Sequence, residues 1–369
     1  MKVMYPDYTN SIVNFMASIR KFYGLSYQHN TMPKLDEVLS KDYKNIIMIL
    51  LDGMGSNIIS KTIGDNSFLA KKKVADFSSV FPCTTAAATT AYLSCKTPIE
   101  NAWLGWHMYF KQIDNDVTLF LNQGYYNGIK YDTSITGTYI PYKSIITELN
   151  EIGVKADLIN APFINKEDKV IENQLEKVKE FIKSSDSKKF MYVYNDDPDH
   201  TIHGEGVSSK KTFKVIKKLN DALKKFYKEI DDETLVLVCA DHGLVDVLEI
   251  NLFGYPKILS YLKRLPSIEP RAATFYVKDG YHKEFEEEFN SLWKDEFVLL
   301  TKKEVYEKQI FGVGIPHPLV DDFIGDYLAL SKGRYMFGYN EASEYDVMKA
   351  THAGLLEDEM LIPLIVLKK

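Results

Sequence analysis

Cysteine is scarce in this sequence of 369 residues, and the few cysteines follow no recognisable pattern. The three are Cys83, Cys95 and Cys239, and no two of them form a C-x-x-C pair. A disulfide framework requires paired cysteines at regular spacings, so none is expected. Internal repeats, low-complexity tracts and flexible Gly/Ser linkers are missing as well, which leaves an ordinary globular chain.

Long apolar runs and an excess of positive charge are also missing. No segment reaches the length of a membrane span, and the first residues contain no apolar stretch of signal-peptide length. The formal net charge of -6 gives no general reason to bind a nucleic-acid polymer or an anionic membrane. We therefore expect a cytoplasmic protein that acts on a small molecule.

Several short apolar runs predict strands that are buried on both faces, as in a parallel sheet. They cover residues 46–51, 190–194, 235–240 and 361–367. Between them, apolar residues recur at helical spacing over residues 8–23, 165–185 and 208–232. The alternation of strand and helix predicts an α/β fold with a doubly wound, mostly parallel central sheet flanked by helices.

Two stretches interrupt this alternation. Residues 97–150 are rich in aromatic residues, glycine and asparagine, and we expect long loops there. Residues 250–345 contain further short apolar runs and a helical pattern near 281–294, which predict a small inserted α/β lobe. The expected domains are a core of residues 1–249 and 346–369 and this inserted lobe.

Acidic residues and histidines recur where the predicted strands end. In an open parallel sheet, ligands collect outside the carboxyl ends of the strands. Each residue alone has a structural explanation as a turn residue, a helix cap or an exposed histidine. Six such residues, all near the ends of predicted strands, favour one common site. They are Asp52, Asp199, His203, Asp241, His242 and His352.

These side chains have the chemistry of a metal site. Asp199 and His203 are four residues apart, so on a helix they share one face and can chelate one ion. Asp241 and His242 are adjacent, and a bend at the strand end lets both reach one centre. Mixed carboxylate and imidazole ligands suit Zn²⁺ or Mn²⁺ better than Mg²⁺. A binuclear site would clamp both the attacking and the leaving oxygen of a phosphoryl transfer.

The stretch FPCTTAAATT, residues 81–90, contains a candidate nucleophile. It places Thr84 and Thr85 ahead of a run of small residues, where a helix is expected to begin. Metal ions lower the pKa of a threonine hydroxyl, and a helix N-terminus adds positive potential where the anion forms. Threonine is also a favoured N-cap residue, and the stretch taken by itself favours the cap.

Taken together and in order, the motifs resemble the alkaline phosphatase superfamily, most closely its type I phosphodiesterase and nucleotide pyrophosphatase family. FPCTT is similar to the nucleophile motif F-P-x-x-T, YNDDPDHTIHGEG to Y-x-x-x-P-D-x-x-x-H-x-x-G, and ADHG to S-D-H-G. The segment around His352 is similar to G-x-H-G, with Ala350 and Ala353 where the family has glycine. The resemblance implies an alkaline phosphatase-like fold.

The resemblance also implies roles for the candidate residues. It implies one divalent ion held by Asp199, His203 and His352, and a second held by Asp52, Asp241, His242 and Thr85. Thr85 is the implied nucleophile, whereas Thr84 falls on a variable position and keeps the role of a helix cap. The two ions implied are Zn²⁺, or else Mn²⁺.

The activity implied is hydrolysis of phosphodiester or pyrophosphate bonds of nucleotide-type substrates through a phosphothreonine. Trp103, Trp106 and His107 are candidates for stacking a base or aryl group, and packing within a loop explains each of them equally well. Ala88 stands where eukaryotic members have an asparagine that holds a phosphate oxygen, which weakens inference about the substrate from those members. The alternatives are a phosphomonoesterase or phosphomutase of the same superfamily, or a non-catalytic metal-binding relative.

Overall fold

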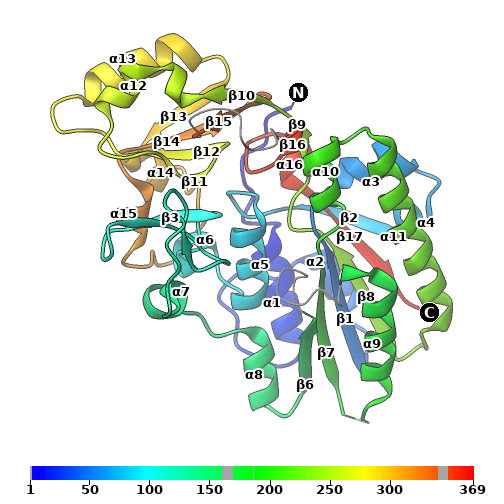
Figure 1. The fold of residues 1–369 in the computed structure, drawn as a ribbon. Helices are drawn as coiled ribbons and strands as arrows, with labels where there is room; N and C mark the ends of the chain where they lie inside the picture. The colour runs from blue at the N-terminus through cyan, green and yellow to red at the C-terminus, as the bar shows by residue number, and fades with distance from the viewer. Residues whose placement is uncertain (1, 160–168, 186, 340–347) are drawn as a thin grey trace.

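The computed structural model describes residues 2–159, 169–185, 187–339 and 348–369 (Figure 1). The helices are α1 (Ile12–Phe22), α2 (Pro33–Val38), α3 (Ser56–Ile63), α4 (Phe68–Lys72), α5 (Thr85–Ser94), α6 (Pro98–Asn101), α7 (Ile135–Tyr139), α8 (Ile145–Glu151), α9 (Ile171–Lys183), α10 (Asp199–Glu205), α11 (Lys210–Glu229), α12 (Pro256–Tyr261), α13 (His282–Trp293), α14 (Lys302–Glu307), α15 (Val320–Ile324) and α16 (Glu357–Met360). A short 3-10 helix, η2, covers Leu252–Gly254.

The strands belong mainly to two sheets. They are β1 (Asn45–Leu51), β2 (Lys73–Ser78), β3 (His107–Phe110), β4 (Asn115–Thr118), β5 (Gln123–Gly124), β6 (Lys155–Ile159), β7 (Lys189–Asn195), β8 (Thr234–Cys239), β9 (Val245–Asp246), β10 (Leu248–Asn251), β11 (Ser267–Glu269), β12 (Ala272–Phe275), β13 (Phe297–Thr301), β14 (Tyr327–Ser331), β15 (Tyr335–Gly338), β16 (Ala350–Thr351) and β17 (Leu361–Leu367). Figure 1 shows α5 between the two sheets.

The first sheet has six strands in the order β2-β17-β8-β1-β7-β6. Strands β8, β1, β7 and β6 run parallel, whereas β17 is antiparallel to both of its neighbours. Every residue of β1, β7 and β8 is buried, because helices cover both faces. The predicted doubly wound, mostly parallel sheet is therefore confirmed, and the four predicted strands are β1, β7, β8 and β17.

The predicted helices are also present. The predicted range 8–23 contains α1, 165–185 contains α9, and 208–232 contains α11. Residues 165–168 of the second range lie outside the described residues. Along α11, the buried side chains are Thr212, Ile216, Leu219, Asn220, Leu223 and Phe226. This spacing places them on the buried face of α11, and the lysines of α11 lie on its other sides.

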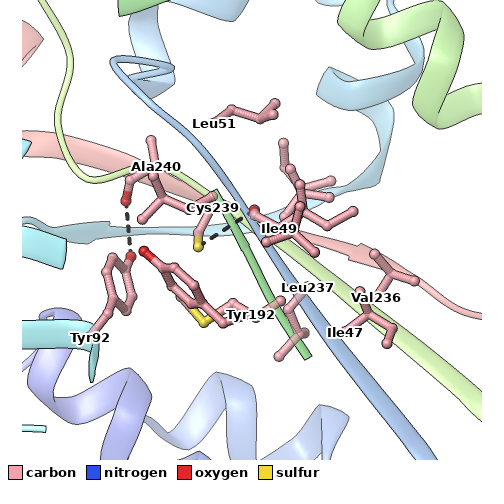
Figure 2. Close-up of a cluster of buried hydrophobic side chains, with 14 of the residues drawn as sticks. Ile47, Ile49, Leu51, Tyr92, Tyr192, Val236, Leu237, Cys239 and Ala240 are labelled. Carbon is pink, nitrogen blue, oxygen red and sulfur yellow. Dashed lines mark hydrogen bonds between the residues drawn. The ribbon is translucent and has the colours of Figure 1, made fainter. Parts of the chain in front are cut away.

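Side chains from the central strands and α5 form the core beneath the site (Figure 2). Figure 2 shows Tyr92 of α5 pointing toward the end of β8, where its hydroxyl donates to the carbonyl oxygen of Ala240 at 2.9 Å. Ala88 is fully buried in the same core. Tyr92 thus links the helix that begins at Thr85 to the strand that precedes Asp241.

The second sheet has seven strands in the order β13-β14-β12-β11-β3-β4-β5. Strands β11 to β14 come from the predicted inserted lobe, but β3, β4 and β5 come from residues 107–124. The expectation of long loops over residues 97–150 is therefore wrong, since His107 of β3 pairs with Ile268 of β11 and completes a sheet. The domain boundary at residues 249 and 250 remains a prediction.

None of the helices in the described part of the chain combines the length and the hydropathy that crossing a bilayer requires.

Candidate active site

The acidic residues and histidines that follow the strands of the first sheet converge at its carboxyl edge. Strands β1, β7 and β8 run parallel, so their carboxyl ends lie together. Asp52 follows β1, Asp241 follows β8, and α10 begins at Asp199 shortly after β7. His352 follows β16 and lies beside Asp199.

The first group of ligand atoms comes from Asp52, Asp241 and His242, which are all buried and whose ligand atoms lie within 4.8 Å of one another. His242 Nε2 lies 3.4 Å from Asp52 Oδ1 and 3.6 Å from Asp241 Oδ2. The other oxygen of Asp241, Oδ1, accepts hydrogen bonds from the backbone N–H groups of Gly53 and His242, both at 3.0 Å. These two bonds fix the carboxylate and leave Oδ2 for another partner.

The second group centres on Asp199. Its Oδ2 lies 3.2 Å from His203 Nε2, and its Oδ1 lies 3.9 Å from His352 Nε2. Ligand atoms of Asp199, His242 and His352 lie within 4.8 Å of one another, and the rings of His242 and His352 stack with centroids 3.7 Å apart. The two groups are therefore adjacent. The assignment of His203 to one ion and His242 to the other remains a prediction.

All three histidines are anchored in the same way. Nδ1 of His203, His242 and His352 lies 2.8, 3.1 and 3.2 Å from the carbonyl oxygens of Ala350, Gly243 and Cys83, respectively. A carbonyl oxygen only accepts hydrogen bonds, so Nδ1 carries the proton in each neutral ring. Each Nε2 then offers a lone pair, as a metal ligand must.

Burial and neighbouring charges shift the pKa values of the candidate ligands. Burial raises the pKa of Asp52 well above its usual range, and the charge of Asp241 raises it further. Burial also raises the pKa of Asp241. Burial by itself would raise the pKa of Asp199, but His203 outweighs it and holds this pKa below the usual range. Burial lowers the pKa of His352 well below its ordinary value. A neutral imidazole can offer its lone pair to a cation, and a cation would offset the repulsion between the neighbouring carboxylates.

Two buried carboxylate oxygens test whether the residues fit a metal ion. Asp199 Oδ1 and Asp241 Oδ2 are buried and, within the described ranges, have no hydrogen-bond partner. Burying a carboxylate oxygen without a donor is unfavourable, and a bound cation would remove that cost. The mixed set of carboxylates and imidazoles suits Zn²⁺ or Mn²⁺. The residues present therefore fit a divalent-metal site.

Gly53 allows the first strand to turn sharply beside α10. Its φ is +70°, a conformation that residues with a side chain rarely adopt. A Cβ atom there would also lie 2.9 Å from the Cβ of Asp199 and 2.5 Å from Cδ1 of Leu244. The glycine thus brings Asp52 and Asp199 to the same centre.

Thr85 is the first residue of α5, and its hydroxyl faces the first group of ligands. Its Oγ1 lies 3.2 Å from His242 Nε2 and 3.3 and 3.5 Å from the two carboxylate oxygens of Asp52. Because α5 has ten residues, its aligned peptide dipoles place positive potential at this end. The hydroxyl therefore lies beside the first ligand group and in the positive potential of the helix N-terminus.

Thr84 occupies the N-cap position of α5, but its side chain does not cap the helix. Its Oγ1 instead donates to Oε1 of Glu269, at 2.6 Å. Burial raises the pKa of Glu269 to about 7, although hydrogen bonds from Thr84 and Trp106 act in the opposite direction. The expected capping role of the Thr84 hydroxyl is wrong, since its oxygen accepts no hydrogen bond from the first turn of α5 while its O–H donates to Glu269. The local sequence around Glu269 contains no signal of this contact.

Tyr194 contacts the candidate site, and the sequence does not reveal this contact. It is buried near the end of β7, opposite Leu50 of β1, and its hydroxyl donates to Asp52 Oδ2. It is the first residue of the motif YNDDPDHTIHGEG, which is the only local signal. The contact follows from strand pairing, which a motif does not describe.

The three aromatic candidates lie in the second sheet and its surroundings. Trp103 is buried and donates from Nε1 to the carbonyl oxygen of Ile140 at 3.1 Å, as a packed residue does. Trp106 is partly buried, and its backbone N–H binds Glu269. His107 is buried with Nδ1 3.3 Å from Asp116 Oδ1. Binding of substrate by these residues remains a prediction.

A comparison with protein families matches residues 46–354 to the type I phosphodiesterase / nucleotide pyrophosphatase family. The chain belongs to this family. The matched range includes every candidate metal ligand and both threonines, so the resemblance drawn from the motifs is confirmed. Members of this phosphodiesterase family are hydrolases. No protein in a search of curated sequences matches the chain.

Solved structures share its fold. An inactive variant of murine ectonucleotide pyrophosphatase/phosphodiesterase 5 in complex with AMP has a TM-score of 0.66 and 15% identity, covering 88% of this chain and 87% of that chain. The human protein of that name has a TM-score of 0.65 and 15% identity, covering 86% and 87%. Phosphonoacetate hydrolase from Sinorhizobium meliloti in complex with phosphonoformate has a TM-score of 0.64 and 15% identity, covering 89% and 91%. At such identities the likeness is one of fold.

Proposed function

We propose that this family member is a metal-dependent hydrolase that cleaves phosphodiester or pyrophosphate bonds of nucleotide-type substrates through a phosphothreonine at Thr85. The observation that carries the proposal is the place of Thr85 Oγ1, at the N-terminus of α5 and within 3.5 Å of both Asp52 and His242. Membership in a phosphodiesterase family supports it.

The chain's own residues account for two displacements at phosphorus. Thr85 Oγ1 attacks, a new P–O bond forms, the bond to the leaving alcohol or phosphate breaks, and the proton given up by the Thr85 hydroxyl ends on that leaving group. Water then attacks the phosphothreonine, phosphate or a phosphate monoester departs, and Thr85 regains its hydroxyl proton. The first-turn N–H groups of α5 orient the phosphate oxygens, since no side chain caps this helix.

The two groups of ligands would hold two divalent cations. Asp199, His203 and His352 would bind one, and Asp52, Asp241, His242 and the Thr85 hydroxyl would bind the other. Zn²⁺ or Mn²⁺ there would lower the pKa of the Thr85 hydroxyl and neutralise the charge of the phosphate. The buried hydrogen bonds to Asp241 and to the three Nδ1 atoms hold these ligands in place.

The test compares Thr85→Ala with Thr84→Ala. Both variants are stripped with a chelator, reloaded with Zn²⁺ or Mn²⁺ and assayed with bis(p-nitrophenyl) phosphate. We expect Thr85→Ala to lose at least about a thousandfold in kcat, because it removes the nucleophile. Thr84→Ala should stay within about threefold of the unchanged enzyme, since its hydroxyl touches neither ligand group.

Acid quenching of the reaction with bis(p-nitrophenyl) phosphate, followed by mass spectrometry, should find a p-nitrophenyl phosphoryl group on the peptide that contains Thr85. The assignment of the nucleophile is wrong if Thr85→Ala keeps the original rate while Thr84→Ala loses it. Turnover of p-nitrophenyl phosphate, but not of the diester, would replace the diesterase by a phosphomonoesterase. No turnover of either compound by the metal-loaded protein would support a non-catalytic relative.

A further inference from the structure

A buried carboxylate of the second sheet reaches the turn that precedes Thr85. Glu269 ends β11 and is only 4% exposed. Its Oε1 accepts two hydrogen bonds, from Thr84 Oγ1 at 2.6 Å and from the backbone N–H of Trp106 at 2.7 Å. Glu269 therefore joins a strand of the second sheet to the first residue before α5.

The bond to Glu269 changes what Thr84 does at the start of the helix. Thr84 has the extended backbone of an N-cap residue, with φ -138° and ψ 151°, yet it makes no side-chain cap. An N-cap threonine ordinarily accepts a hydrogen bond from an N–H two or three residues ahead, here Ala86 or Ala87. With its hydroxyl directed to Glu269, Thr84 leaves those N–H groups without a side-chain acceptor.

The open N–H groups lie next to the reacting hydroxyl. Thr85 Oγ1 is within 3.5 Å of Asp52 and His242, so a phosphate under attack must lie at this end of α5. Free N–H groups at a helix N-terminus bind phosphate oxygens. A hydroxyl that capped the same turn would occupy these donors and compete with the phosphate.

We propose that Glu269 is a positioning residue, which draws the Thr84 hydroxyl away from the first turn of α5 and so keeps that turn open for the phosphate. The inference rests on the proposed role of Thr85. Among the described residues, Glu269 hydrogen-bonds to Thr84 and Trp106 and to neither the nucleophile nor a metal ligand, although its charge acts on Asp199 and His203; the positioning role is exerted through Thr84. Removing its carboxylate releases the Thr84 hydroxyl, which then caps the helix.

The hydrogen bond from Trp106 to the same oxygen of Glu269 depends on a close approach of two backbone segments. Gly105 precedes Trp106, and a Cβ atom on Gly105 would lie 2.6 Å from the carbonyl oxygen of Ile268. The absence of a side chain lets the two segments approach, so that the Trp106 N–H reaches Glu269. Two donors from different parts of the chain therefore hold one carboxylate oxygen, and the rotamer of Thr84 follows from it.

The test asks whether Thr84→Ala restores the activity that Glu269→Ala loses. A positioning role of Glu269 predicts that it does, and a purely structural role predicts that it does not. The variants are Glu269→Ala, Glu269→Gln, Thr84→Ala and the double variant Glu269→Ala/Thr84→Ala, all loaded with metal. We measure kcat/KM for bis(p-nitrophenyl) phosphate and the inhibition constant of inorganic phosphate. Glu269→Ala should lose roughly tenfold in kcat/KM and bind phosphate more weakly, a change of the size of one N-cap interaction.

The other three variants decide the cause. Glu269→Gln should stay within about threefold of the unchanged enzyme, because an amide oxygen accepts the same two hydrogen bonds. The double variant should recover to the level of Thr84→Ala, since no hydroxyl is left to cap the helix. If the double variant is as impaired as Glu269→Ala, or more so, Glu269 acts only by supporting the sheet and the proposal is wrong.

Folding and activity are separated by two further measurements. Thermal unfolding and metal content are recorded for each variant, and Glu269→Leu, which fills the buried volume, replaces Glu269→Ala if the latter does not fold. Phosphate binding is also measured by calorimetry. Suppression seen in phosphate binding without any turnover of diester would uphold Glu269 and overturn the proposed function. Equal turnover of the diester by all the variants would uphold the proposed function and overturn the role of Glu269.

Discussion

At the scale of single residues, the candidate ligands are held by partners that have no reactive role of their own. Three histidines anchor Nδ1 on backbone carbonyls, and Asp241 is fixed by two backbone N–H groups. Asp52 has a side-chain partner, because the hydroxyl of Tyr194 donates to its Oδ2. Such partners orient a ligand before the ion arrives, and their loss weakens metal binding.

Tyr194→Phe should therefore weaken the site without unfolding the protein. We expect the affinity of the stripped protein for Zn²⁺ to fall by about 10- to 100-fold, because the Asp52 carboxylate loses the bond that fixes its orientation. Competition with a chromogenic chelator measures the change. Tyr192→Phe is the matched control, since Tyr192 lies in the same strand and its buried hydroxyl has no hydrogen-bond partner in the described part of the chain. Equal affinities for the two variants would contradict the role of Tyr194.

At the scale of helices and strands, the sequence predicts those elements whose own pattern of apolar residues shows which side chains are buried. The central strands are continuous apolar runs, and α11 has one apolar face, so both are visible without any knowledge of the neighbours. Strands β3 to β5 are short and pair mainly with one another, and β3 joins the rest of the second sheet where His107 pairs with Ile268 of β11. Local composition there predicts loops, because strands of two to four residues leave no long apolar run in the sequence.

The same distinction applies to the candidate site. Asp52 and Asp241 are predictable because each directly follows an apolar strand, and parallel strands end at one edge. Tyr194 and Glu269 are not, because their contacts depend on strand pairing and on how the second sheet meets α5. Ala88 is neither a residue that the sequence predicts for the site nor a distant residue that the fold brings to it. The structure buries it in the core, where it offers no group to a phosphate.

Helix α6, which follows the nucleophile helix, has a cap that should be sensitive to acid. Oε2 of Glu100 accepts hydrogen bonds from the N–H and hydroxyl of Thr97, at 2.9 and 2.8 Å, and lies 2.8 Å from His29 Nε2. Burial alone would raise the pKa of Glu100, but His29 and Thr97 outweigh burial and hold this pKa below its usual value of 4.5. A lowered pKa stabilises the folded state above the unfolded value, and this stability is lost as the pH falls through the folded value.

Glu100→Gln should accordingly destabilise the protein by about 1 kcal/mol at pH 5, the size of a charged hydrogen bond lost from a partly buried cap. The difference in the free energy of unfolding should shrink between pH 5 and pH 3, because the carboxyl of the unchanged protein becomes protonated. Urea unfolding at pH 5, 4 and 3 measures it. Glu307→Gln, in an exposed pair with Lys303, is the control and should cost little at any pH. A difference that grows as the pH falls would refute the interpretation.

At the scale of the whole molecule, one buried ion pair joins the second sheet to the segment that carries His352. Arg271 lies between β11 and β12, and its guanidinium binds both carboxylate oxygens of Glu359, at 2.8 and 2.7 Å. Neither side chain is exposed. Glu359 also accepts a hydrogen bond from the N–H of Gly354, two residues after His352. The position of His352 therefore depends on a contact with the other sheet.

Arg271→Met should destabilise the protein by about 3–5 kcal/mol, because it leaves the charge of Glu359 buried without a partner. The free energy of unfolding from denaturant titration measures this loss, and Zn²⁺ affinity should fall with it as the segment of His352 loosens. The double variant Arg271→Met/Glu359→Gln removes the buried charge and keeps an acceptor for Gly354, so it should recover at least about half of the lost stability. If the pair merely fills space, the double variant is no more stable than the single one. Recovery of stability together with Zn²⁺ affinity would mean that the unpaired buried charge of Glu359, and not the loss of the ion pair itself, loosens the segment that carries His352.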